Sequence, residues 1–241
     1  MSRSSTSLQT VVNNAISWAP HLVTASGLIF GFLSTVEIFA LHYRTALIWM
    51  TAAVVSDAID GTIARKLNSA ENIPDFDGAL LDAIVDYITY VMVPVIFIYK
   101  AELIPLTYNN WVLPSILIAS AYQFAQSESK SADNFFTGFP SYWNVAVLYM
   151  LLLKPSPTNN LILLSVLTVL IFIPIKYYYP SRTTKHKTTI MSVAIIWGIS
   201  GFILIYTYPT VYPAPLWISI ICSTYYIAIS IFNTLFHKSI D

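Results

Sequence analysis

Long apolar segments, separated by short polar ones, follow one another along almost the whole chain. No Asp, Glu, Lys or Arg occurs between Ser4 and Val36, or between Thr188 and His237. A helix that crosses a membrane needs about 20 mostly apolar residues, because lipid offers no water to satisfy backbone polar groups. Polar and proline-containing breaks divide the chain into these candidate spans: Leu22–Leu41, Thr45–Arg65, Gly78–Tyr99, Trp111–Gln126, Tyr142–Leu153, Leu161–Tyr178, Thr188–Tyr208 and Leu216–Phe236.

This pattern predicts an all-α fold, a polytopic integral membrane helical bundle with about eight transmembrane helices. The segments take up most of the length, so we expect a single membrane domain over residues 1–241. Of the 241 residues, 56% are hydrophobic and 10% are charged, whereas soluble domains have about 25% charged residues. The single cysteine, Cys222, lies in an apolar segment, which excludes disulfides and cysteine-based metal sites.

The charges balance in number but not in position. There are 12 basic and 12 acidic residues, which argues against a nucleic-acid partner. With an even number of spans both termini share one side of the membrane, and the basic residues of that side are Arg3, Arg65, Lys66, Lys130, Lys176, Arg182, Lys185, Lys187 and Lys238. The opposite side has Arg44, Lys100 and Lys154. Because basic loops stay inside the cell, we expect both termini in the cytoplasm.

Acidic residues gather in the second and third segments. Asp57 and Asp60 are three positions apart and Asp82 and Asp86 are four apart, so each pair projects from one face of a helix. An antiparallel hairpin over residues 45–99 would bring the two pairs together near its cytoplasmic end. Four carboxylates repel one another, and hard divalent cations with oxygen ligands, Mg²⁺ or Mn²⁺, are the natural partners. Two ions explain four carboxylates better than one; the alternative is a hydrated acidic helix end.

Small residues and one arginine accompany these acids. Gly61 and Ala64 lie one turn apart beside the first pair, and Gly78 lies one turn before the second pair. Such residues leave room for a ligand to approach the backbone closely, although close helix packing alone explains them equally well. Arg65 offers the paired donors that suit phosphate. Together the residues indicate a pyrophosphate or nucleotide site.

The order and spacing of these residues resemble the signature of the CDP-alcohol phosphotransferases. The matching positions are Asp57-x2-Asp60-Gly61-x2-Ala64-Arg65 and Gly78-x3-Asp82-x3-Asp86. The interval between Arg65 and Gly78 is longer than in most members, and in this the chain is similar to a bacterial branch of the family that uses choline. Residues 138–144 (Gly-Phe-Pro-Ser-Tyr-Trp-Asn) and 179–183 (Tyr-Pro-Ser-Arg-Thr) carry the same similarity.

The resemblance implies a reaction in which CDP-diacylglycerol and choline give phosphatidylcholine and CMP. It implies that Asp57, Asp60 and Asp82 bind two divalent ions, with Mn²⁺ favoured over Mg²⁺. Asp86 would be both a metal ligand and the general base that takes the hydroxyl proton. It further implies a bacterial inner (plasma) membrane protein with a cytoplasmic active site, and it favours a homodimer.

The resemblance also implies a binding site for CDP-diacylglycerol. The residues that would receive its CDP moiety are Gly61, Ala64, Arg65 and Gly78. Many members have Asn-x-x-Thr on the first helix, and the corresponding segment here runs from His21 to Thr24. Thr24 would therefore line the nucleotide site, and we interpret His21 as an interfacial cap at the start of the helix.

Choline recognition must rest on groups other than hydrogen-bond acceptors, because a quaternary ammonium has no N–H to donate. Aromatic faces and one acidic group are the expected partners. The candidates are Tyr87, Tyr90, Tyr142 and Trp143, with Glu128 as the counter-charge. Each of these also has an ordinary interpretation as a residue of the interfacial belt, the core or a helix cap.

Other functions compete with this one. Serine, inositol or glycerol phosphate could replace choline as the acceptor. A divalent-cation transporter would also have intramembrane carboxylates, but it would not explain Arg65 beside them. An intramembrane prenyltransferase uses Asp-rich motifs with Mg²⁺, and the Asp-Gly-x2-Ala-Arg string fits that class poorly.

Overall fold

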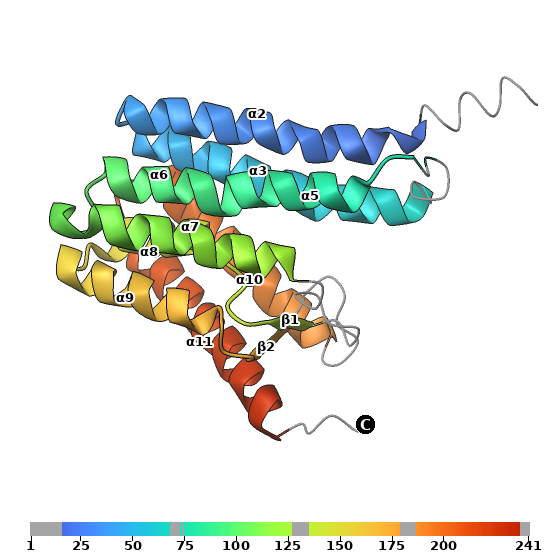
Figure 1. The fold of residues 1–241 in the computed structure, drawn as a ribbon. Coiled ribbons are helices and arrows are strands. Elements are labelled where there is room, and N and C mark those ends of the chain that lie inside the picture. The colour runs from blue at the N-terminus through green and yellow to red at the C-terminus, as the bar shows by residue number, and fades with distance from the viewer. Residues whose placement is uncertain (1–15, 68–72, 74, 127–134, 179–186, 237–241) are drawn as a thin grey trace, which may run out of the picture. The chain divides into compact units, whose positions relative to one another are not determined.

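A computed structural model describes residues 16–67, 73, 75–126, 135–178 and 187–236 of the chain (Figure 1). The chain folds into two compact units that divide between Val93 and Pro94. The described residues are mostly helical, which confirms the all-α prediction at this level. The single domain over residues 1–241 stays a prediction.

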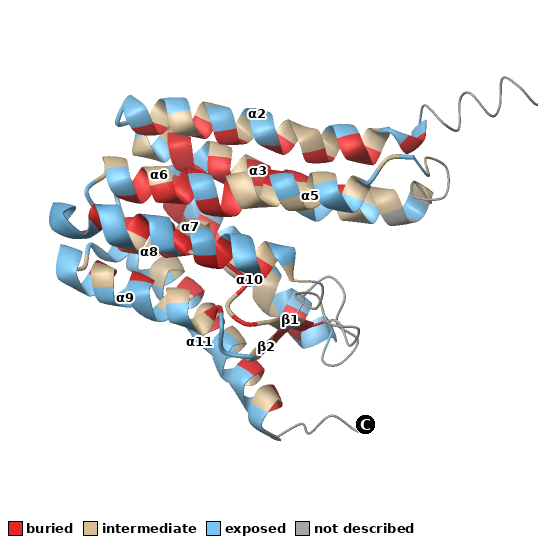
Figure 2. Cartoon of the chain, viewed as in Figure 1, coloured by how far each residue is buried: buried red, intermediate tan, exposed pale blue. Residues whose placement is uncertain are grey.

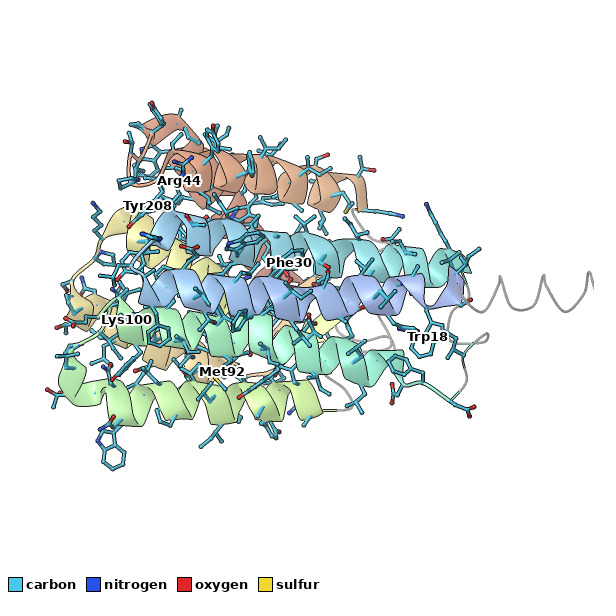
Figure 3. All side chains as sticks on the ribbon, turned by 90° about the horizontal axis from the view of Figure 1, so that it is seen from above. Trp18, Phe30, Arg44, Met92, Lys100 and Tyr208 are labelled. Carbon is cyan, nitrogen blue, oxygen red and sulfur yellow. The ribbon has the colours of Figure 1, made fainter. Side chains whose placement is uncertain are left out.

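The N-terminal unit is built from helices that follow one another in the chain. They are α2 (Ala19–Phe39), α3 (Tyr43–Leu67), α5 (Gly78–Asp86) and a π-helix, η1 (Tyr87–Met92). Helix α2 packs along α3 and also contacts α5 and η1. Helices α2, α3 and α5 lie side by side in Figures 1 and 3. Figure 3 labels Trp18, at the N-terminal end of α2.

Small and polar side chains fill the face of α2 that packs on its neighbours. At Gly27 an added Cβ would lie 2.7 Å from Cγ1 of Val85 on α5. The hydroxyl of Ser34 donates a hydrogen bond to the carbonyl oxygen of Ala46 on α3, at 3.0 Å. Helices in lipid associate through such small residues and interhelical hydrogen bonds. Large apolar residues lie on the other face, where Phe32 is 66% exposed.

The C-terminal unit contains the remaining helices and a small sheet. Helix α6 (Val93–Lys100) leads into it, and the further elements are η2 (Leu106–Tyr108), α7 (Asn109–Ala125), β1 (Phe135–Thr137), α8 (Trp143–Leu153), α9 (Pro157–Leu170), β2 (Lys176–Tyr178), α10 (Lys187–Thr207) and α11 (Pro213–Phe236). Helix α7 packs on α9, α10 packs on α11, and β2 lies against α11.

The expected helix over Leu161–Tyr178 is wrong in its second half. Helix α9 ends at Leu170, and Lys176–Tyr178 is instead a strand that pairs antiparallel with β1, with Phe135 opposite Tyr178. Pro174 accounts for the change, because proline has no N–H and disfavours helical backbone at the residue before it. The aromatic residues that follow suit a strand.

Five helices of the described part of the chain are long and apolar enough to cross a membrane. They are Ala19–Phe39, Tyr43–Ala64, Gly78–Lys100, Lys187–Thr207 and Pro213–Leu235. Large apolar side chains are exposed along these helices, for example Phe202 at 59% and Leu235 at 70%, and Figure 2 shows how much of the helical surface is exposed. Exposed apolar helices of this length identify a membrane protein. Helices α7, α8 and α9 are shorter, so eight crossings stay a prediction.

Candidate active site

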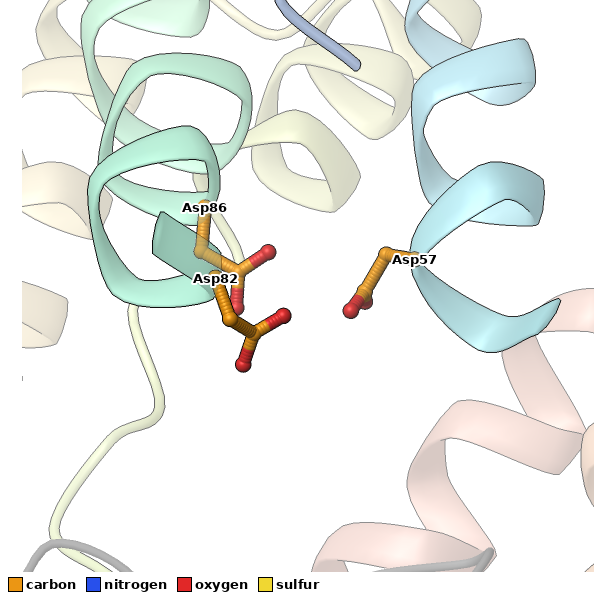
Figure 4. Close-up of side chains that lie close together, drawn as sticks. All are labelled: Asp57, Asp82 and Asp86. Atoms are coloured by element: carbon orange, nitrogen blue, oxygen red, sulfur yellow. The ribbon is translucent and has the colours of Figure 1, made fainter. Parts of the chain in front are cut away.

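Three carboxylates converge in the N-terminal unit. Asp57 projects from α3, and Asp82 and Asp86 project from successive turns of α5 toward it (Figure 4). One oxygen from each carboxylate lies within 4.8 Å of the others, and all three side chains are half-buried. This arrangement confirms the predicted meeting of the two acidic segments for these three residues. We call them the carboxylate group.

The fourth motif aspartate, Asp60, has a different surrounding. Its side chain is buried, at 4% exposure, and its Oδ2 accepts a hydrogen bond from the hydroxyl of Thr24 on α2. Asp60 is not part of the carboxylate group. Its role as a metal ligand therefore stays a prediction, and the structure links it to Thr24, a residue expected to line the nucleotide site.

Tyr90 supports the carboxylate group from the π-helix η1. Its hydroxyl donates a hydrogen bond to Oδ2 of Asp57 at 2.8 Å. At the end of η1 the N–H of Val93, its C-cap, donates to the carbonyl oxygen of Ile88, five residues back. Pro94 follows and cannot donate to the carbonyl of Tyr90, so a regular helix cannot continue through this point. Such π-helical turns often occur at functional sites, and the sequence alone gave no sign of this contact.

His21 is a buried residue, and the expectation that it caps the helix at an interface is wrong. Trp18 is the N-cap of α2 and makes no side-chain capping bond. The His21 ring is packed against Trp18 and Phe76, at centroid distances of 5.8 and 4.8 Å. A Cβ added to Gly78 would lie 2.5 Å from Cε1 of His21. The imidazole therefore occupies the space that glycine leaves at the start of α5.

Asp77 shows that one nearby acid has a structural role. It is the N-cap of α5, where its carboxylate accepts a hydrogen bond from the backbone N–H of Leu80 at 2.9 Å. Such a cap satisfies one of the unpaired N–H groups at a helix start. Asp77 therefore fixes where α5 begins and so which turns carry the aspartates.

The other predicted site residues fall into three groups. Gly61 and Ala64 lie half-buried on α3. The side chain of Arg65, the whole of Glu128 and residues 179–183 lie outside the described residues. The aromatic candidates for choline are Tyr87, half-buried beside Asp86, Tyr90, described above, and Tyr142 and Trp143 in the C-terminal unit.

Trp143 has a surrounding typical of a core residue. Its side chain is 0% exposed, its indole N–H donates to the hydroxyl of Ser120 at 2.8 Å, and its ring makes an edge contact with Phe139. Tyr142 is half-buried at the N-cap of α8. Their contact with choline is untested and stays a prediction.

The donor set of the carboxylate group fits a hard divalent cation. All the ligand atoms are carboxylate oxygens, the type that Mg²⁺ and Mn²⁺ prefer. Three carboxylates so close together repel one another unless a cation balances them. The Tyr90 hydroxyl orients Asp57 in the way that outer hydrogen bonds orient metal ligands. The residues present therefore match the metal requirement expected from the sequence.

The Tyr90→Phe variant is expected to weaken the metal requirement without removing it. Losing an outer hydrogen bond to a metal ligand costs about 10- to 100-fold in metal affinity or activity. The Mn²⁺ concentration for half-maximal activity should therefore rise by about that factor. Tyr99→Phe is the matched control, because Tyr99 is 56% exposed on α6. Identical Mn²⁺ dependence of the two variants would show that the hydrogen bond has no role.

Residues 17–173 match the family model of CDP-alcohol phosphatidyltransferases. The match includes α2, α3 and α5 with all four motif aspartates. The chain belongs to the CDP-alcohol phosphatidyltransferase family.

Curated relatives that match most of the chain are named phosphatidylcholine synthase. The chain is 42% identical to the phosphatidylcholine synthase of Borreliella burgdorferi over 185 residues, 77% of this chain and 79% of the relative. It is 41% identical to the phosphatidylcholine synthase of Legionella pneumophila, over 84% of this chain and 82% of the relative. It is 35% identical to the phosphatidylcholine synthase of Pseudomonas aeruginosa, over 93% of this chain and 94% of the relative.

Proposed function

We propose that this chain synthesises phosphatidylcholine by transferring the phosphatidyl group of CDP-diacylglycerol to choline, with release of CMP. The observation that carries the proposal is the similarity to proteins named phosphatidylcholine synthase over most of both chains. The carboxylate group supports it, because transfer from a diphosphate needs bound cations and a base.

The reaction assigns separate tasks to the residues of the site. Asp57, Asp60, Asp82 and Asp86 would hold two divalent ions, Mn²⁺ in preference to Mg²⁺. The bound ions supply positive charge that offsets the charge of the diphosphate. Asp86 takes the proton from the choline hydroxyl. The choline oxygen then forms a bond to the phosphorus that carries diacylglycerol, and the bond from that phosphorus to CMP breaks, so CMP leaves with the electron pair.

The nucleotide half of the substrate is assigned to the start of α5 and the facing part of α2 and α3. Thr24 and Gly78 lie on these elements, and Gly61 and Ala64 follow Asp60 on α3. The hydrogen bond between Thr24 and Asp60 connects the predicted nucleotide residues to a predicted metal ligand. Arg65 is proposed to bind the diphosphate through its guanidinium.

Choline is assigned to aromatic faces on the helix that carries Asp86. Tyr87 is the next residue after Asp86 and is half-buried, and Tyr90 is fixed by its bond to Asp57. A ring held in place loses little freedom when it contacts a cation, and cation–π attraction needs no donor on the ligand. Tyr142, Trp143 and Glu128 are the further candidates.

The cellular placement follows from the basic residues. Nine of the 12 lie on the side that holds both termini when the spans are even in number. We infer an inner-membrane protein of a bacterium with both termini and the site facing the cytoplasm. CDP-diacylglycerol would enter from the membrane and choline from the cytosol.

An acceptor panel tests the proposed function. Purified protein with Mn²⁺ and labelled CDP-diacylglycerol is offered choline, serine, inositol or glycerol 3-phosphate, and CMP and the lipid product are measured. We expect labelled phosphatidylcholine with choline and at least about tenfold less product with the others, because a site that holds choline by aromatic faces leaves the polar groups of these alcohols unpaired. Equal product from serine would assign the chain to another branch of the family. Absence of CMP release with every acceptor would contradict the enzyme activity itself.

A further inference from the structure

The C-terminal unit has a pocket at the ends of several helices, remote in sequence from the aspartates. Glu102 and Leu103 after α6, Lys154 and Pro155 after α8, and Tyr208 after α10 are among the residues that line it. Its volume is about 180 Å³. A water molecule takes up about 30 Å³ in the liquid, so the pocket has room for a polar head group.

Asn160, one of the lining residues, carries an unsatisfied buried acceptor. This residue lines the pocket from the first turn of α9 and its side chain is 3% exposed. Its Nδ2 donates to the carbonyl oxygen of Leu103 at 2.8 Å, which fixes the orientation of the amide. Its Oδ1 has no hydrogen-bond partner among the described residues. Buried acceptors are almost always paired, so a ligand with an N–H or O–H donor would complete this site.

Two side chains of opposite charge, Glu102 and Lys154, line the same pocket and do not form an ion pair with each other. Neither Glu102 nor Lys154 forms an ion pair with a described residue. Both have left-handed backbone, with φ of 51° and 48°. At Lys154 this conformation ends α8, as left-handed caps commonly do, and so it fixes where the side chain leaves the helix end. The two residues thus present a negative and a positive charge to one small space.

The polar groups of the pocket indicate which class of ligand it binds. Lys154 suits a phosphate, and Glu102 together with Oδ1 of Asn160 suits a primary ammonium, which can donate to both. A quaternary ammonium has no hydrogen to give to Asn160, and an anionic head group has nothing to pair with Glu102. Leu103, Met150 and Leu151 supply apolar surface beside the polar groups, and the pocket lies where apolar helices end.

We infer that this pocket binds the head group of a zwitterionic phospholipid with a primary ammonium, of the phosphatidylethanolamine type. With the eight crossings predicted from the sequence, Lys100 and Lys154 lie on the side of the membrane opposite the termini, so the lipid would belong to that leaflet. The site uses none of the motif aspartates. It therefore stands independently of the proposed transfer reaction and of the acceptor used.

A methylation series of the head group tests the inference. The purified full-length protein in detergent is titrated, without metal or CDP-diacylglycerol, with short-chain phosphatidylethanolamine and its mono-, di- and trimethylated forms. We expect affinity to fall along the series, by about tenfold at the trimethylated form, because the charge-assisted hydrogen bonds are lost. Soluble glycerophosphoethanolamine should bind more weakly, since it lacks the acyl chains. Equal affinity along the methylation series would overturn the inference, and soluble head group binding as tightly as the lipid would overturn the lipid as its source.

Two variants test the residues themselves. Glu102→Gln removes the partner of the ammonium, and Lys154→Asn removes the partner of the phosphate while keeping a residue that tolerates left-handed backbone. Each should lower phosphatidylethanolamine affinity about tenfold. Lys100→Gln is the matched control, because Lys100 is close in sequence and does not line the pocket. If both pocket variants bind as tightly as the control, the assignment is wrong.

Discussion

Changing Asp57, Asp82 or Asp86 to Asn is expected to abolish turnover and leave a folded membrane protein. Asparagine keeps the size of the side chain and removes its charge, so the repulsion within the carboxylate group falls. The variants should therefore be at least as stable as the wild type. For Asp86, loss of the general base alone predicts a drop of about 10²- to 10⁴-fold in CMP release.

The controls for this prediction come from the same region. Asp77→Asn removes an identical charge just before α5, but asparagine caps a helix as well as aspartate does and can still accept from Leu80. Activity should stay close to wild type. Removal of divalent metal by a chelator should abolish the activity of the wild type, and added Mn²⁺ should restore that activity. Full activity in any one of the three variants would remove that residue from the site.

Asp60→Asn extends the test to the residue outside the carboxylate group. If Asp60 is a ligand as the motif implies, activity should fall as far as in the Asp57 variant. Thr24→Val removes the donor to Asp60 and nearly keeps the side-chain shape, so its effect should be smaller. A Thr24 variant that is more impaired than Asp60→Asn would show that Thr24 acts on the substrate and not through Asp60.

The second large effect concerns Gly138 and the stability of the C-terminal unit. Gly138 has a φ of +81°, and a Cβ added there would clash with the backbone oxygen of Ile171. Left-handed backbone costs a residue with a Cβ about 1–2 kcal/mol, and overpacking costs about 1–3 kcal/mol more. Gly138→Ala should therefore lower the free energy of unfolding by about 2–5 kcal/mol.

Gly198→Ala is the matched control for this change. Gly198 lies inside α10, and a Cβ there would meet nothing within 4 Å. Alanine favours a helix over glycine by about 1 kcal/mol, so stability should stay the same or rise. Denaturant unfolding of both variants in detergent measures the difference. Equal stability of the two would mean that the turn at Gly138 is not formed as described.

The common face of Asp82 and Asp86 was predictable because it depends on local spacing alone, and the antiparallel hairpin expected from two consecutive apolar segments brings Asp57 to them. Residues four apart are separated by about 400° around a helix, which is one full turn and about 40° more, so Asp82 and Asp86 lie on nearly the same face. Residues three apart are separated by about 300°, which leaves Asp60 turned by about 60° from Asp57. That rotation explains why the structure directs Asp60 to Thr24 and leaves Asp57 with the other two carboxylates.

Other features were beyond the sequence because they depend on tertiary packing. Hydropathy predicts where apolar helices lie, and the bounds of α2, α3, α10 and α11 agree closely with it. It cannot show that β1 pairs with β2, since a three-residue strand has no periodic pattern to detect. The contact of Tyr90 with Asp57 and the burial of His21 against Gly78 likewise join residues far apart in the chain.

The compact N-terminal unit also has a consequence for the order in which the helices associate during synthesis. The carboxylate group, Thr24 and Tyr90 all come from helices that precede the boundary at Val93. Membrane helices insert first and associate afterwards, and contacts between helices that are consecutive in the chain form early because little chain entropy is lost. We therefore expect the residues of the carboxylate group to meet before the last two helices, α10 and α11, are complete, so a nascent chain would present its cation-binding residues before translation ends.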